Sequence, residues 1–228
     1  MHKREDYKKV NIFKLLFMFI SKPSEFLKYI KEFDYKKEII LFTLVFFFII
    51  SFPIQRLDYI SNNIENTGFS AIIFNTFITT LVVTIVFFLR NYFFYLFYLF
   101  TMNFLTLRKD NYINQSVFLT VFTVSLIKGL DTFIKSIKSL FLIDKTALLS
   151  SESFREFIDL PVSISKIFNI SDGIFYPFFS YITIFHIAEI FIIMYFFSKI
   201  FRTSLIKTAI PIIMVWSFIF LITFVQSF

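Results

Sequence analysis

Residues 69–89, FSAIIFNTFITTLVVTIVFFL, form a stretch of 21 residues without a charged side chain. A helix needs about 20 apolar residues to cross a hydrocarbon core of roughly 30 Å. Two later stretches have the same character. Residues 174–197 carry only His186 and Glu189 as charged or imidazole side chains, and residues 208–228 carry none. These runs predict a protein that crosses a membrane several times.

The composition agrees with residence in a membrane and excludes several kinds of site. Apolar residues make up 57% of the 228 residues and charged residues only 17%. Because the chain has no cysteine, it has no disulfide, zinc thiolate site or thiol nucleophile. Its two histidines are too few for a histidine-based metal cage. No cofactor and no metal are therefore expected.

The apolar runs divide into five predicted transmembrane helices of an all-α polytopic membrane protein. Backbone groups in lipid must be hydrogen-bonded within the spanning structure, and long runs without apolar–polar alternation favour helices over barrel strands. Pro53 predicts a break near the end of the first span, and Arg90 is expected to reach the interface from the second. The spans cover about residues 39–54, 69–89 with an extension to 107, 112–130, 175–197 and 208–228.

The distribution of basic residues predicts the orientation. Residues 1–38 hold ten Lys and Arg against six Asp and Glu, residues 90–111 hold three against one, and residues 198–207 hold three and no acid. Five spans with a cytoplasmic N-terminus place all three segments inside and the C-terminus outside, as the positive-inside rule requires. A sixth span over residues 92–107 would move the basic 198–207 loop outside, so we expect one long second helix instead.

This orientation predicts a multi-pass protein of the inner (cytoplasmic) membrane. The net charge of +7 then reflects cytoplasmic segments, and no nucleic-acid partner is expected. Residues 1–38 form a basic cytoplasmic region ahead of a membrane domain over residues 39–228. Within the basic region, residues 12–20 are apolar apart from Lys14, and Pro23 marks the start of a second helix. Its apolar residues recur at helical spacing at Phe26, Leu27, Ile30 and Phe33.

Basic charge beside an apolar face favours binding to anionic lipid. We expect residues 1–37 to form a pair of amphipathic helices on the anionic inner leaflet. A groove on a partner protein is the alternative, and membrane protein partners or further copies of the chain stay open.

A second amphipathic region is predicted between the third and fourth spans. Residues 151–157 read as a short helix that Pro161 ends. An apolar stripe precedes it at Phe133, Ile134, Ile137, Leu140 and Phe141. We expect both segments to lie along the outer surface or to cap the helix bundle.

His186 and Glu189 are the sharpest candidate site. They are three residues apart, so they share one helix face, and His186 is the central residue of the predicted 175–197 span. A charged side chain at the centre of a bilayer costs from about 2.5 to over 10 kcal/mol, so the pair must neutralise itself, face the bundle interior or line water. A proton or cation relay, a metal site completed by carboxylates elsewhere, and a structural clamp between helices all stay open.

The clamp interpretation has candidate partners on two neighbouring spans. Small hydroxyl residues repeat there at helical spacing, which allows close packing and hydrogen bonds between helices in lipid. This helix-packing polar face comprises Asn75, Thr76, Thr80, Thr84, Ser116, Thr120 and Thr123.

Four stretches resemble the bacterial Yip (Ypt/Rab-interacting protein) family. They are FISKPSEFL at 19–27, LTLRKDNYINQS at 105–116, SDGIF at 171–175 and SLIKTA at 204–209. The resemblance extends from about residue 12 to the end of the chain. It implies five membrane helices with the N-terminus inside and the C-terminus outside. The Asp-Leu-x-Gly-Pro motif of eukaryotic members is absent, so the resemblance implies neither small-GTPase binding nor a trafficking role.

Two functional classes remain, and no enzyme is expected because the chain has no phosphate loop, metalloprotease motif, dinucleotide fingerprint or nucleophile elbow. The first is a non-enzymatic membrane protein of Yip type that organises lipids or protein partners. The second is a small transporter, or a proton or cation conductor, that uses His186 and Glu189.

Overall fold

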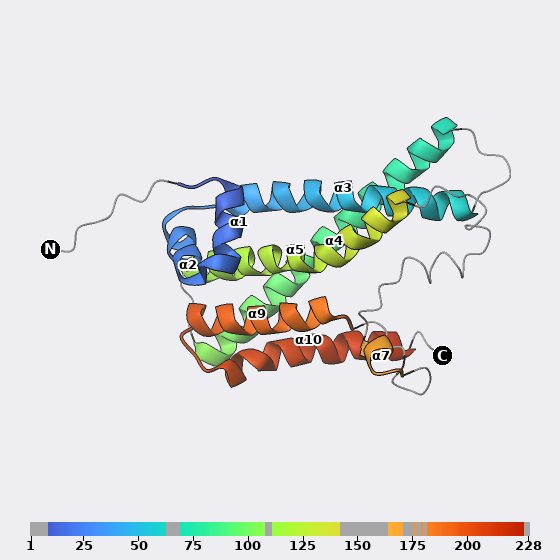
Figure 1. Ribbon diagram of the computed structural model, residues 1–228. Helices are drawn as coiled ribbons and strands as arrows, with labels where there is room; N and C mark the ends of the chain where they lie inside the picture. The colour runs from blue at the N-terminus through green and yellow to red at the C-terminus, as the bar shows by residue number, and fades with distance from the viewer. Residues whose placement is uncertain are drawn as a thin grey trace.

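The computed structural model describes residues 9–62, 69–107, 111–141, 164–170, 176, 179 and 182–225, and the regular elements in these ranges are helices (Figure 1). They are α1 (Ile12–Ser21), α2 (Pro23–Glu32), α3 (Lys36–Asn62), α4 (Phe69–Thr106), α5 (Asn111–Phe141), α7 (Ile164–Ile167), α9 (Ile184–Ile200) and α10 (Leu205–Val225). The predicted helix over residues 151–157 lies outside the described residues.

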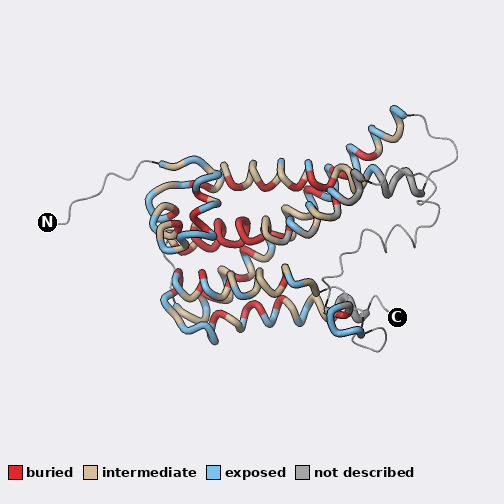
Figure 2. The backbone as a smooth tube through the Cα atoms, viewed as in Figure 1, coloured by how far each residue is buried: buried red, intermediate tan, exposed pale blue. Residues whose placement is uncertain are grey.

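Three of the helices in the described ranges are long and apolar enough to cross a membrane. They are Lys36–Arg56 within α3, the whole of α4, and Tyr112–Ile134 within α5, while Leu205–Leu221 in α10 is a shorter apolar segment. Figure 2 shows exposed positions along the outer sides of α4 and α10 and a mostly buried first half of α5. Because soluble proteins rarely expose large apolar surfaces, the exposed Phe, Leu and Ile side chains of these helices suit lipid.

α3 differs from the predicted first span. The predicted span over residues 39–54 ends at a break caused by Pro53, but α3 continues through Pro53 to Asn62. Proline removes one backbone donor and crowds the carbonyl four residues earlier, a cost that packing against other helices can absorb. The prediction of a break was therefore wrong.

α5 is also longer than its predicted span over residues 112–130. It continues to Phe141, so the apolar stripe that begins at Phe133 belongs to this helix and not to a separate interfacial one. Lys128 and Asp131 interrupt the apolar run but do not break a helix, because lysine is a good helix former and neither residue removes a backbone donor. The predicted boundary followed the end of the apolar run, whereas the helix itself continues beyond that run.

α4 is one continuous helix of 38 residues, in line with the expected extension to about residue 107. At 1.5 Å per residue it is about 57 Å long, well beyond a hydrocarbon core of roughly 30 Å. A single buried stripe follows the helix from end to end: Thr76, Thr80, Thr84, Asn91, Tyr95, Tyr98 and Met102. The other faces are apolar and largely exposed, so α4 crosses the bundle with one protein-facing side.

Aromatic contacts define how the helices run. Phe46 and Phe47 of α3 approach Gly129 of α5, whereas Lys36 lies over the Phe118 ring, so α3 and α5 run in the same direction. α4 runs against them, because Phe88 contacts Phe122 whereas the later Tyr95 contacts the earlier Phe118, with ring centroids 5.5 and 5.1 Å apart.

One end of the bundle collects most of the described basic residues. The first residues of α3, α5 and α10 and the last residues of α4 and α9 meet there, with α1 and α2 beside them (Figure 1). Exposed basic side chains at this end include Lys14, Lys22, Lys28, Lys31, Lys37, Lys199, Arg202 and Lys207.

Candidate functional site

His186 lies in the first turn of α9 and not at the centre of a span. The prediction extended the fourth span back to residue 175, but α9 begins at Ile184. The Nδ1 atom of His186 accepts a hydrogen bond from the backbone N–H of Thr183 at 3.2 Å and lies 2.8 Å from the Thr183 hydroxyl oxygen. A side chain at the third helical position that returns to the N-cap backbone satisfies a donor at the helix start. His186 therefore helps to begin α9.

His186 and Glu189 contact different helices. The buried His186 ring packs edge-on against Trp216 of α10, with ring centroids 5.4 Å apart and an interplanar angle of 87°. The half-buried Glu189 lies near enough to the buried Tyr98 of α4 for its charge to act on the phenol. His186 therefore packs α9 against α10, and Glu189 lies on the side of α9 near α4. Sequence reasoning missed Trp216, although it is the one tryptophan of the chain.

The predicted polar face of α4 is buried, but the hydroxyls of Thr80 and Thr84 bond within their own helix. Thr80 donates to the Thr76 carbonyl at 2.7 Å and Thr84 donates to the Thr80 carbonyl at 2.8 Å. Asn75 is half-buried at the edge of this face. A hydroxyl bonded to the carbonyl four residues earlier needs no partner on another helix. These side chains therefore give α4 a small surface for close packing.

The polar face of α5 is also buried. Ser116, Thr120 and Thr123 are at most 4% exposed. Among the described residues, the hydroxyls of Ser116 and Thr120, together with those of Thr76 and Thr43, have no hydrogen-bond partner. Thr43 of α3 was missed because a lone threonine carries no periodic signal. This seam is a buried weakly polar interior.

The N-terminal helices belong to the bundle. The predicted start of α2 at Pro23 is confirmed. Its Phe26 and Ile30 are fully buried, and Phe26 packs edge-on against Phe196 of α9 with ring centroids 5.6 Å apart. Phe19 of α1 stacks on the same Phe196 ring at 4.4 Å. The apolar face that the sequence predicted for α2 is therefore covered by protein.

α1 has a second apolar face, and this face is uncovered. Phe13 and Phe17 are each 69% exposed and Ile20 is 76% exposed, at spacings of four and three residues. We call these three residues the α1 ridge. Phe13 also reaches Phe42 of α3, with ring centroids 5.6 Å apart, so α1 lies across the end of the bundle from α3 to α9.

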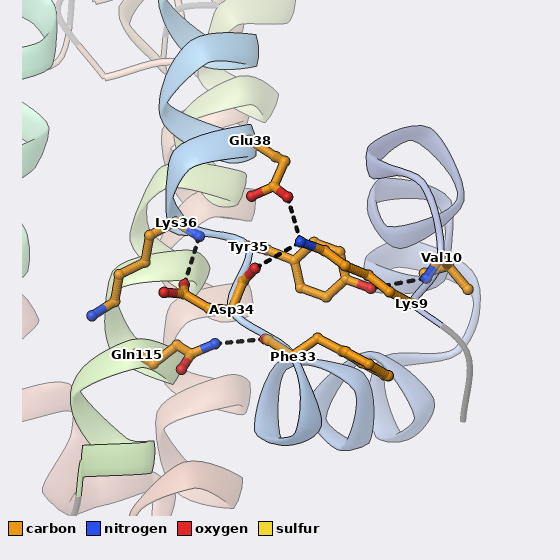
Figure 3. A network of polar contacts seen from close by, with 8 residues as sticks. All are labelled: Lys9, Val10, Phe33, Asp34, Tyr35, Lys36, Glu38 and Gln115. Carbon is orange, nitrogen blue, oxygen red and sulfur yellow. Dashed lines mark hydrogen bonds and ion pairs between the residues drawn. The ribbon is translucent and has the colours of Figure 1, made fainter. Parts of the chain in front are cut away.

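A network of polar contacts holds the chain before α1 to the start of α3 (Figure 3). Lys9 forms an ion pair with Glu38 and donates to the Asp34 carbonyl, and the Val10 N–H donates to the Tyr35 hydroxyl at 3.1 Å. The hydrogen bond that Lys9 donates to the Glu38 carboxylate raises the pKa of Lys9 above its ordinary value, and burial raises the pKa of the Tyr35 phenol.

A longer-range contact extends this network to α5. The Gln115 side-chain amide donates to the Phe33 carbonyl at 2.7 Å, across 82 residues of sequence. It satisfies the carbonyl at the C-terminal end of α2, where helices leave carbonyls unpaired. The connection between α2 and α3 is therefore hydrogen-bonded to the membrane helices.

The described residues contain no cluster of three or more His, Cys, Asp or Glu side chains that could hold a metal ion. The groups that the structure brings together here are aromatic rings, hydroxyls and one carboxylate. Such an arrangement can position helices and contact apolar ligands.

Comparison with protein-family models, with curated proteins and with solved structures finds no match for this chain.

Proposed function

We propose that this chain is a non-enzymatic, five-span integral membrane protein of Yip type, which organises lipids or protein partners through its N-terminal helices. The observation that carries the proposal is the position of α1 across the bundle end, with one face in the core and the α1 ridge uncovered. A helix with a buried face and an exposed apolar face suits the boundary between lipid headgroups and acyl chains.

The five-span arrangement is supported by α9 and α10, which join the three longer helices. α9 has 17 residues, or about 26 Å at 1.5 Å per residue, so it approaches the thickness of a hydrocarbon core. The gathering of exposed lysines and arginines at the α1 end supports a cytoplasmic N-terminus in the inner membrane, since basic residues are enriched on that side.

Cysteine labelling tests this orientation, because the chain has no cysteine of its own. An impermeant thiol reagent should label the Ser61→Cys and Ser151→Cys variants in intact cells. The Ser204→Cys variant should react only after permeabilisation, since Ser204 precedes α10 at the basic end. The reverse pattern would contradict the proposed orientation.

The lipid-organising role is tested by purification in native-lipid particles followed by mass spectrometry of the bound lipids. Anionic lipids should be enriched over the bulk membrane, because exposed lysines near the surface attract them. Changing Lys28, Lys31 and Lys37 together to Gln should reduce the enrichment, and changing all three to Arg should preserve it. Lipid composition equal to that of the bulk membrane in every variant would rule the role out.

A transporter or a proton or cation conductor is the second candidate, and the half-buried carboxylate of Glu189 within the apolar helix α9 favours it. An ionisable side chain among apolar residues is typical of ion and proton pathways in membrane proteins. The relay predicts that Glu189→Gln abolishes a pH-driven flux in proteoliposomes without changing stability.

If His186 and Glu189 instead form a structural clamp between helices, the opposite pattern is expected for Glu189 variants. No flux is expected, Glu189→Gln should be neutral, and Glu189→Leu should destabilise the bundle slightly, since a hydrogen bond between membrane helices contributes roughly 0.6 kcal/mol. Thermal unfolding in detergent measures the second effect, and a flux that Glu189→Gln removes would favour the transporter.

A further inference from the structure

An apolar groove of about 270 Å³ lies between α1 and α9, at the basic end of the bundle. Its floor is the stacked pair Phe19 and Phe196, and its sides come from the end of α1 and two turns of α9. The lining residues are Phe19, Ile20, Pro23, Phe191, Tyr195 and Phe196.

The rims of the groove are apolar and exposed. Ile20 on one rim is 76% exposed and Phe191 on the other is 66% exposed. Such side chains would be unfavourable in water, so the mouth of the groove suits acyl chains.

Two lysines neighbour residues that line the groove. Lys199 lies over the Tyr195 ring, 5.7 Å from its centroid, one turn beyond the groove. Lys22 directly precedes Pro23 of the lining, and its only described ion pair is a surface contact with Glu25 at 3.2 Å. Exposed ion pairs of this kind are weak, so a phosphate can compete for the lysine.

The geometry points to an anionic glycerophospholipid as the occupant of this groove. We infer that one acyl chain lies along Phe191 and Tyr195, while Lys22 and Lys199 attract the net negative charge of the headgroup one helical turn, about 5.4 Å, further along α9. This inference rests on the proposed membrane orientation and identifies the lipid class that the basic end would select.

The molecule contains a matched control groove. A second apolar groove of about 310 Å³ lies between α9 and α10 and is lined by Ile190, Ile212, Ile213, Trp216, Ser217 and Phe220. None of these residues is charged, so this groove should accept acyl chains without regard to the headgroup. Its native Trp216 reports directly on lipid contact.

Fluorescence quenching by lipids with brominated acyl chains tests the inference in the full-length protein. A reporter variant combines Trp216→Phe with Phe191→Trp, and the wild-type chain reports the control groove. Brominated phosphatidylglycerol and brominated phosphatidylcholine are each titrated into unbrominated phosphatidylcholine bilayers. The reporter should bind phosphatidylglycerol about fivefold more tightly, as expected for one lysine–anion attraction at a membrane surface, and Trp216 should not distinguish the two lipids.

Charge variants distinguish lipid binding in this groove from general electrostatic attraction of anionic lipids to the basic end. Lys22→Gln with Lys199→Gln in the reporter background should abolish the preference. Lys14→Gln with Lys207→Gln removes the same charge from two other exposed lysines at the basic end and should leave the preference intact. Equal quenching by both lipids in the reporter, or equal loss in both double variants, would overturn the inference.

The outcome is distinguishable from failure of the proposed function. If native-lipid particles contain enriched anionic lipid but the reporter shows no preference, the groove inference alone fails. If the reporter shows the preference while proteoliposomes carry a flux that Glu189→Gln removes, the scaffold role fails and the lipid site stands.

Discussion

α1 and α2 are two amphipathic helices of 10 residues each, yet the structure uses them differently. α2 turns one apolar face to the protein and its lysines outward, so it is a packing element. α1 packs Leu15, Met18 and Phe19 into the core and leaves the α1 ridge uncovered. Helical periodicity identifies an apolar face, but the neighbours of the helix decide whether protein or lipid covers it.

The largest expected effect on stability comes from removing a side chain that α2 packs into the core. Phe26→Ala should lower the free energy of unfolding by about 3–5 kcal/mol, because it leaves a cavity beside Phe196 that the bundle cannot fill. The matched control, Phe17→Ala on the α1 ridge, should change it by less than about 0.5 kcal/mol. Equal losses in thermal unfolding would mean that the ridge is also packed against protein.

A spectroscopic measurement tests the lipid side of the contrast at smaller energetic cost. A polarity-sensitive dye attached through Phe17→Cys should show blue-shifted emission in liposomes and be quenched by a lipid-borne quencher. The same dye at Lys28→Cys on the exposed side of α2 should report water. Water-like emission from both positions would contradict a membrane contact of α1.

The smallest effect concerns the polar network ahead of α1. The pKa values of Lys9 and Tyr35 are raised above their ordinary values of 10.5 and 10.0, so the folded state binds more protons than the unfolded state in that range. The stability that they contribute is complete below about pH 10 and is lost as the pH rises through the folded pKa values.

Hydrogen exchange at the Val10 amide, which donates to Tyr35, should therefore accelerate above about pH 10 beyond the intrinsic base-catalysed rate. Glu38→Gln removes the ion pair and should weaken this dependence, whereas Glu32→Gln, on an exposed residue near the end of α2, should not. An identical pH profile in all three proteins would assign no role to the Lys9 contact.

The candidate site illustrates where sequence reasoning ended. His186 and Glu189 were recognised as unusual because ionisable residues are rare in apolar runs. Their partners could not be predicted, because Tyr98 and Trp216 lie on other helices and only packing brings them together. The first predicted span was shorter than α3, because hydropathy does not detect that the helix continues past Pro53. The fourth predicted span began before α9, because hydropathy does not mark the helix start at Ile184.

The sequence by itself determined that this protein is helical and membrane-associated, because uncharged runs of about 20 residues leave the backbone few other ways to satisfy its hydrogen bonds in lipid. It also determined that two amphipathic helices precede the first long one, because apolar residues recur there with helical spacing. Only the tertiary structure decided that α2 faces protein and the α1 ridge does not, and that α1 and α9 form a groove. These features depend on contacts between residues far apart in the chain, such as Phe19 with Phe196, and no local pattern encodes them.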